Sequence, residues 1–172
     1  MKGFVCRTCG GYHDEVPLTF GPDAPWSWDE APPSVRATDS VLTSDQCILG
    51  GEHYFVRGCL DLPIHGRTDV FRWLVWVSVS EASFERMCEL WNTAGREAEP
   101  PYFGWLNTWL PDYPDIFHLK VNVHTRPVGQ RPYVQVEPTS HPLALEQRHG
   151  ISWEDVLRRV ERLLHPTSTN EA

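Results

Sequence analysis

The most regular alternation of apolar and polar residues in this chain runs over residues 117–124, where every second side chain is apolar. Successive side chains of a β-strand point to opposite faces of the sheet, so this pattern predicts a half-buried strand. Residues 131–137 repeat the alternation, and Gly129 lies in the short connection between the two segments. A glycine in such a connection is typical of a β-hairpin, which we expect here.

Two further segments, residues 53–62 and 71–79, are predicted to be neighbouring strands. The first is rich in β-branched and aromatic residues, and the second is apolar on both faces. A strand that is apolar on both faces is typical of the centre of a sheet that is covered on both sides. Gly66 marks the connection between the two strands.

A helix is predicted to follow Ser80, which is a favourable N-cap residue. Four apolar residues then recur at helical spacing and form one stripe: Phe84, Met87, Cys88 and Trp91. Such a stripe packs against a core, and Gly95 is expected to end the element.

The C-terminal part of the chain is predicted to be helical. Residues 142–149 form a short helix that stops at Gly150. Ser152 and Asp155 resemble a capping box at the start of a strongly amphipathic helix, which Pro166 prevents from continuing. Residues 166–172 are interpreted as a flexible tail.

Two segments have less regular patterns. Residues 21–46 contain several prolines and are expected to run over the surface with a short helical turn. Residues 102–113 combine aromatic residues with prolines, and a short helix is predicted over residues 104–110. This aromatic segment is expected to pack over one end of the core, and the alternative is an exposed patch that binds a partner.

Strands and helices mixed without regular βαβ alternation predict the α+β class. A chain of 172 residues is long enough to bury roughly 70% of its unfolded surface as one domain. We expect a single domain over residues 1–165, with a mostly antiparallel sheet, two main helices on one face and an N-terminal knuckle at residues 4–13.

The charge of the chain limits its partners. Fifteen Lys and Arg residues face 23 Asp and Glu residues, which gives a formal charge of −8. An acidic chain without a basic cluster lacks the footprint of a nucleic-acid binder or of a protein that binds anionic membranes. An unknown protein, a metal ion or a small anionic ligand remain as possible partners, and the oligomeric state is not specified.

Cysteine usage indicates a reducing compartment. The chain has five cysteines, an odd number, and its first residues contain no apolar run of the kind found in a signal peptide. Close cysteines in a reducing environment bind metal more often than they form disulfides. We therefore expect a cytoplasmic protein.

Cys6 and Cys9 form the sharpest chemical motif, a Cys-x-x-Cys pair that is followed by Gly10 and Gly11. Two thiolates at this spacing can bind one tetrahedral zinc ion when the backbone turns tightly around it, which glycine permits. His13 is the expected third ligand and Cys47 the expected fourth. Three further residues are weaker candidates for the ligand set: Cys59, His53 and His65. For Cys59, as for Cys88, a place in the hydrophobic core is the favoured interpretation.

The same pair has two other interpretations, a reduced pair without metal and a redox dithiol. A redox dithiol needs its first cysteine at a helix N-terminus, where the helix dipole lowers the thiol pKa. Two glycines directly after Cys9 start a helix poorly, so the zinc interpretation is favoured.

No familiar catalytic motif is present, but five polar residues are candidates for an unfamiliar site. The arginines among them could bind a carboxylate or phosphate through two parallel hydrogen bonds, and the histidines could move protons. His118 and His124 share the polar face of one predicted strand, and exposure of that face to solvent is the more ordinary explanation of their position. The candidates are Arg57, His118, His124, Arg131 and His141.

Several short segments give the chain a specific resemblance to a bacterial family known as domain of unknown function 2199. The resemblance extends from Phe4 to Leu164 and includes Cys6-x-x-Cys9-Gly10 with His13, Ser44-Asp45-Gln46-Cys47, Phe55-Val56-Arg57-Gly58-Cys59 and Glu137-Pro138-Thr139-x-His141-Pro142. It implies a bacterial protein with a single-domain fold and no assigned activity. Asp45, Arg57, Arg131 and His141 belong to the family pattern without known roles.

Together these observations predict a zinc-stabilised binding or interaction domain, for example an immunity or regulatory protein. Two alternatives remain open: an enzyme that acts on an anionic small molecule through the Arg and His candidates, and a thiol redox protein that uses Cys6 and Cys9.

Overall fold

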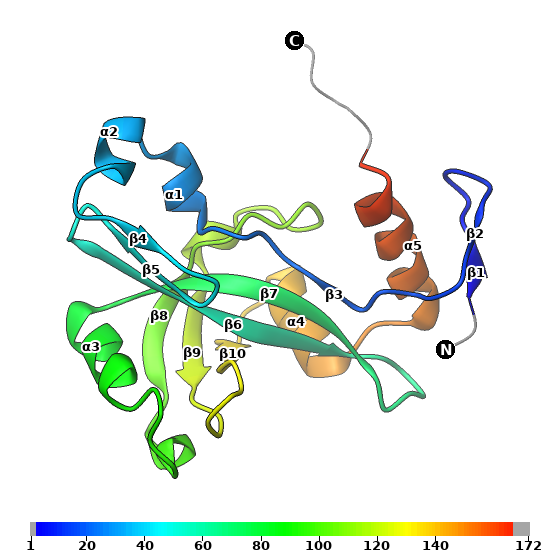
Figure 1. Cartoon of the computed structure of the whole chain (residues 1–172). Coiled ribbons are helices and arrows are strands. Elements are labelled where there is room, and N and C mark those ends of the chain that lie inside the picture. Colours follow the sequence, from blue (N-terminus) through cyan, green and yellow to red (C-terminus); the bar gives the residue numbers. More distant parts are fainter. Residues whose placement is uncertain (1–2, 167–172) are drawn as a thin grey trace.

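The computed structural model describes residues 3–166, and its central β-sheet closes on itself to form a barrel (Figure 1). The five barrel strands follow one another in the chain: β6 (His53–Pro63), β7 (Val70–Val79), β8 (Tyr102–Leu106), β9 (Lys120–His124) and β10 (Tyr133–Val136). Neighbours along this order are antiparallel. The barrel closes where β10 pairs in parallel with β6, with Tyr133 opposite Cys59.

The α+β class is therefore right, and the mostly antiparallel sheet closes into a barrel, which was not predicted. In a meander of five strands the first and the last run in the same direction, so they can pair in parallel and close the sheet. Gly58 permits their close approach, because a Cβ atom there would lie 2.5 Å from Cγ2 of Val134 and 3.0 Å from the carbonyl oxygen of Pro132. An apolar pattern that repeats every second residue is the same in an open and in a closed sheet, so it did not predict the closure.

Three short strands extend the sheet outside the barrel. β5 (Gln46–Leu49) pairs with β6, β4 (Val41–Leu42) pairs with β5, and β3 (Thr19–Phe20) pairs with β7. Residues 21–46 carry two short helices, α1 (Trp26–Glu30) and α2 (Pro33–Arg36). The surface excursion with a helical turn is therefore confirmed.

Strand β6 is buried on both faces. Strand β7 is buried on one face and partly covered on the other, where Trp76 is buried, so the prediction for residues 71–79 is right in part. The main core lies on one face and includes Leu60, Phe71 and Trp73, each at most 1% exposed. A second apolar cluster lies apart from it and consists of Cys47, Leu49, Phe55 and Trp76. Three partly buried residues pack against this second cluster: Trp28, Ala31 and Leu42.

The helices lie at different points around the barrel (Figure 1). α3 (Glu81–Glu89) packs against β6, and α4 (Pro142–His149) packs against β6 and β10. α5 (Trp153–Leu164) contributes Val156 and Val160 to the main core. The predicted arrangement of two main helices on one face of the sheet is therefore not confirmed.

Local capping signals were accurate. The hydroxyl of Ser80 accepts a hydrogen bond from the backbone N–H of Ser83 at the start of α3. Ser152 and Asp155 form the predicted capping box of α5, in which each side chain accepts a hydrogen bond from the backbone N–H of the other residue. Single helical turns occur at Arg96–Ala98 and Ile116–His118.

Two local predictions are wrong. Residues 104–110 do not form a helix, because Tyr102–Leu106 is strand β8 and pairs with both β7 and β9. Cys88 is exposed rather than part of the core, and its sulfur accepts a hydrogen bond from the side-chain amide of Gln46. Tertiary pairing overrides local preference in the first case.

The aromatic segment 102–113 is divided between the two interpretations that its sequence allows. Tyr113 is 5% exposed and packs in the main core, whereas Phe103, Trp105 and Trp109 are between 42% and 54% exposed.

Within residues 3–166, no helix combines the length and the apolar character that crossing a membrane requires.

Candidate metal centre and the neighbouring cleft

The N-terminal hairpin carries the Cys-x-x-Cys pair. Its strands β1 (Phe4–Val5) and β2 (Tyr12–His13) pair in antiparallel fashion, with Phe4 opposite His13. The connecting loop turns tightly, because the backbone N–H of Cys6 donates to the carbonyl of Gly11 and that of Gly10 donates to the carbonyl of Cys6, both at 2.9 Å. Gly10 has φ +72°, a left-handed conformation that glycine adopts without steric cost.

Four potential metal ligands meet at this hairpin: Cys6, Cys9, His13 and His165. One ligand atom from each residue lies within 4.8 Å of the corresponding atom of every other. The Sγ atom of Cys9 is 3.6 Å from Nε2 of His13. Zinc bonds of ideal length at a tetrahedral angle would place a sulfur and a nitrogen ligand about 3.6 Å apart. The cluster is therefore close enough to bind one metal ion.

Both sulfur atoms accept backbone hydrogen bonds, and those to Cys6 favour its thiolate form. Burial raises the pKa of Cys6, but hydrogen bonds from the backbone N–H groups of Cys9 and Thr8 outweigh burial and leave that pKa below its usual value. The backbone N–H of Gly11 donates to the Sγ atom of Cys9 at 3.4 Å. Donors that point at sulfur stabilise its charged form, which is the form that binds metal.

The two histidine rings lie side by side in the cluster. The ring of His13 stacks on Phe4, with 5.0 Å between ring centroids, and its centroid is 5.6 Å from that of His165. The Nε2 atom of His165 is buried and has no hydrogen-bond partner within residues 3–166. Buried polar atoms normally have a partner, and a ring nitrogen without one has its lone pair free to bind a metal ion.

Glu161 of α5 holds the hairpin beside the helix. Its carboxylate accepts a hydrogen bond from the backbone N–H of Arg7 at 2.9 Å. Its carbonyl accepts one from the N–H of His165, the residue that caps the end of α5. Figure 1 shows the hairpin next to α5, which lies on the other side of the molecule from α1 and α2.

Cys47, the expected fourth ligand, lies elsewhere. It is fully buried in the second apolar cluster, and burial raises the pKa of its thiol to about 12. The weaker candidates are also outside the metal cluster: Cys59 is buried in β6, His53 is exposed, and His65 bonds the carbonyl of His149. The fourth member of the cluster is instead His165, a histidine that the sequence did not indicate.

Sequence reasoning missed His165 because its neighbours in the chain carry no metal-binding pattern. The one available signal was its position directly after an amphipathic helix whose capping box fixes where the helix begins. That signal places His165 at the end of α5, but it does not say which part of the chain that end meets.

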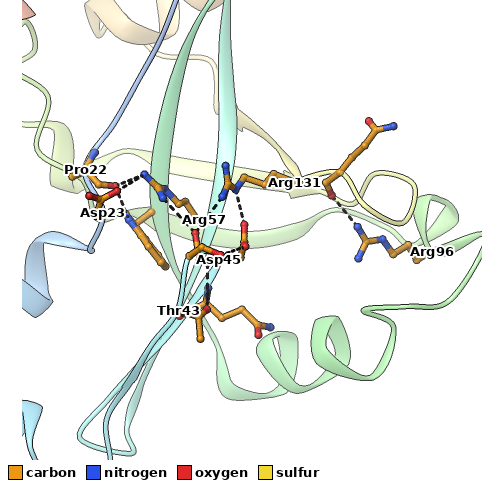
Figure 2. Close-up of polar contacts among 11 residues, drawn as sticks. Pro22, Asp23, Thr43, Asp45, Arg57, Arg96 and Arg131 are labelled. Carbon is orange, nitrogen blue, oxygen red and sulfur yellow. Dashed lines mark hydrogen bonds and ion pairs between the residues drawn. The ribbon is translucent and has the colours of Figure 1, made fainter. Parts of the chain in front are cut away.

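Arg57 and Arg131 converge on the residues that precede β5 (Figure 2). Arg57 is 7% exposed, and its guanidinium donates to the carbonyls of Pro22 at 2.7 Å and of Ser44 at 3.4 Å. Arg131 forms an ion pair with Asp45, with 2.5 Å between Nε and Oδ1. These contacts fasten the 21–46 segment to the barrel.

The candidate histidines have other partners. The Nε2 atom of His124 is 2.9 Å from the side-chain oxygen of Gln135 on the neighbouring strand. His141 caps α4, because its Nδ1 atom accepts a hydrogen bond from the N–H of Leu143 and its Nε2 atom bonds the carbonyl of Pro114 at 2.6 Å. Both histidines therefore have a local structural role.

No hydrogen bond or ion pair within residues 3–166 links His124 or His141 to the arginine pair. The side chain of His118 lies outside the part of the chain that the structure describes. The structure thus brings Arg57 and Arg131 together and leaves His124 and His141 with separate partners.

A buried polar network that the sequence did not predict lies beside α5. Arg159 donates to the hydroxyl of Tyr113 at 2.6 Å and to the carboxylate of Glu146 at 2.7 Å, and it pairs with Asp112 at 3.4 Å. Asp112 also pairs with Arg162 at 2.6 Å. The network borders a cleft of about 780 Å³ whose lining includes Trp73, Trp109, Asp112, Arg162 and His165.

These features define a small α+β protein with a five-stranded barrel and a Cys/His cluster that joins an N-terminal hairpin to α5. The chain belongs to the family described as an uncharacterized protein conserved in bacteria (DUF2199), whose model matches residues 5–151. No curated protein and no solved structure matches the chain. The family match contains Cys6, Cys9, His13 and the barrel, and it ends before His165.

Proposed function

We propose that this protein is a zinc-stabilised binding domain in which Cys6, Cys9, His13 and His165 hold one zinc ion. The observation that carries the proposal is the meeting of four ligand atoms within 4.8 Å of one another. Two thiolates and two imidazoles are a common ligand set of structural zinc sites. A set of four protein ligands leaves no open position of the kind that a catalytic zinc needs, so the ion has a structural role.

The hairpin is the part of the molecule that such an ion would stabilise. Each of its strands has two residues, and Val5 and Tyr12 are 65% and 64% exposed. Among the strand residues Phe4 packs against the main core, so apolar burial holds the hairpin strands through one side chain. A zinc ion shared with His165 adds its binding free energy to folding and fixes the hairpin to the end of α5.

The contacts of the two thiols favour zinc over redox chemistry. Cys6 is fully buried, and the Cys-x-x-Cys loop lies in a β-hairpin rather than at a helix N-terminus, where the helix dipole would activate a thiol. The enzyme alternative has less support, because Arg57 and Arg131 are engaged with backbone carbonyls and Asp45. A binding role is favoured by the cleft beside the metal cluster.

Elemental analysis of the purified protein tests the metal and its ligands together. We expect about one zinc per chain, a stoichiometry that Cys9→Ser and His165→Gln each reduce because a tetrahedral site loses a ligand. Cys47→Ser is the control, since it removes a thiol outside the cluster and should leave the zinc in place.

Two results would contradict this assignment. A wild-type protein that neither contains zinc nor takes it up when zinc is added would overturn the proposal as a whole. Loss of zinc in Cys47→Ser with full retention in His165→Gln would restore the ligand set first expected from the sequence.

A further inference from the structure

The cleft beside α5 has the size of a small-molecule site. Its volume is about 780 Å³, and sites for small molecules commonly range from about 300 to 1,000 Å³. The wall combines residues from distant parts of the chain: Thr8 of the hairpin loop, Phe20 and Pro22 near β3, Trp73 of β7, and α5. Because these segments are held by the barrel and by α5, the cleft is part of the folded structure.

Aromatic residues and prolines form the apolar part of the wall. Trp109 lines the cleft and is 54% exposed, although the neighbouring Leu110 is 1% exposed and anchors the segment. Pro22, Pro111 and Phe20 complete this surface. An exposed indole next to rigid prolines offers a flat surface on which a planar apolar group can stack.

The charged side chains of the wall include more arginines than carboxylates, in contrast to the chain as a whole. Its lining contains two arginines, Arg159 and Arg162, and a single carboxylate, Asp112. The full chain has a formal charge of −8. Glu146, which lies outside the lining, pairs with Arg159 at 2.7 Å. Preference for an anionic ligand therefore depends on the donors that Arg162 leaves free and not on net charge.

The two arginines differ in how many donors they leave free. Arg159 is buried and directs its guanidinium to Tyr113, Glu146 and Asp112. Arg162 has Asp112 as its one ion-pair partner within residues 3–166, through Nη2, and its side chain is 59% exposed. Its remaining N–H groups are therefore available to a ligand.

We propose that this cleft binds a small molecule with a planar apolar body and one acidic group, which Arg162 receives while Trp109 stacks on the body. The cleft gives the proposed binding domain a ligand class but does not depend on the zinc assignment. His165 and Thr8 belong to its wall, so a zinc ion would only fix the position of that wall.

A pair of fluorescent probes separates the apolar from the acidic requirement. The anionic probe is 8-anilinonaphthalene-1-sulfonate, and the neutral probe is N-phenyl-1-naphthylamine, which has the same rings without the sulfonate. Both are titrated into the folded full-length protein, and stoichiometry and Kd are measured. We expect one site per chain that prefers the anionic probe.

Three variants locate the site. Arg162→Gln should weaken the anionic probe about tenfold and the neutral probe less than twofold, because one charge-assisted hydrogen bond is lost. Trp109→Ala should weaken both probes roughly fivefold through lost stacking. Arg158→Gln is the matched control, since Arg158 lies on the same helix, is also 59% exposed and pairs with one aspartate, but does not line the cleft.

Each contrary outcome overturns the proposal. Absence of saturable binding, equal Kd values for the two probes, or unchanged binding in both Arg162→Gln and Trp109→Ala would do so. Equal weakening in Arg158→Gln and Arg162→Gln would place the anion outside the cleft. Circular dichroism of each variant establishes that a loss of binding does not come from unfolding.

Discussion

The barrel and the N-terminal hairpin are held in place by different means. Strands β6 and β7 are joined by ten consecutive residue pairs, and residues such as Leu60 and Phe71 on these strands are completely buried. The hairpin strands β1 and β2 are joined by two residue pairs, and Val5 and Tyr12 point to solvent. The hairpin instead brings together polar atoms that suit a metal.

This difference shows where each kind of stabilisation is needed. Apolar burial contributes roughly 25 cal/mol per Å² removed from water, which is sufficient for a barrel with filled interior positions. A segment that buries little apolar surface needs another contribution, and a metal ion that couples binding to folding can supply it. We therefore expect the barrel to be insensitive to metal removal and the hairpin to depend on it.

The largest effect is expected from a cavity in the barrel core. Phe71 is fully buried and its ring lies 5.0 Å from that of Trp73, so Phe71→Ala removes a large apolar side chain from a packed site. The free energy of unfolding should fall by about 3–5 kcal/mol, measured by urea denaturation. Phe71→Leu should cost less, and the loss should be the same with and without a chelator. A loss that appears only in the zinc-loaded protein would contradict the separation between barrel and hairpin.

Metal removal is expected to have a smaller and more local effect. With free zinc at 100 times its Kd, bound metal stabilises the folded state by about 2.7 kcal/mol, which a chelator should remove. Amide exchange followed by mass spectrometry should then increase in residues 4–13 and remain slow in residues 53–63.

Cys9→Ser should reproduce the exchange pattern of the chelated protein, because it removes one ligand of the cluster. Cys88→Ser is the control, since Cys88 is exposed and lies outside the cluster. Protection that is lost equally from the hairpin and the barrel would show that the two regions unfold as one unit.

The sequence predicted elements whose signals are local. The alternation over residues 117–124 and the capping pair Ser152 and Asp155 depend on neighbours in the chain. The capping pair agrees with the structure, and the alternation is right in part, because the strand covers residues 120–124 whereas residues 116–118 form a helical turn. Barrel closure depends on contacts between Gly58 and Val134, which are far apart in the sequence. The same limit explains the error at residues 104–110, where pairing with two other strands decides the conformation.

In the candidate metal centre, the residues that are close in sequence were predicted, and the residue that is distant in sequence was not. Cys6, Cys9 and His13 lie within eight residues, so their spacing alone brings them together. His165 joins them only because α5 docks beside the hairpin, which local spacing cannot show. Cys47 was expected to be a ligand because of its residue type, but its strand turns it into the apolar cluster around Trp76.

The smallest effect concerns the capping box that begins α5, the helix that carries Arg162 and leads to His165. The hydroxyl of Ser152 donates to the carboxylate of Asp155 at 2.6 Å, and this hydrogen bond lowers the pKa of Asp155. A carboxylate whose pKa is lower in the folded state stabilises the fold above its unfolded pKa of about 3.9. That contribution is lost as the pH falls through the folded value.

Asp155→Asn should therefore cost about 0.5–1 kcal/mol at pH 7, the size typical of an N-cap interaction that is partly screened by solvent. The difference from wild type should begin to shrink as the pH falls below the unfolded pKa of about 3.9, and it should vanish only below the lower pKa that Asp155 has in the folded state. Urea denaturation of metal-free protein measures this difference in unfolding free energy without a contribution from zinc release.

Glu154→Gln is the matched control, since Glu154 lies in the same turn and its carboxylate accepts no hydrogen bond within residues 3–166. A difference between Asp155→Asn and wild type that stays constant down to pH 3 would mean that the carboxylate charge does not stabilise α5, and the capping contribution would then come from hydrogen-bond geometry alone.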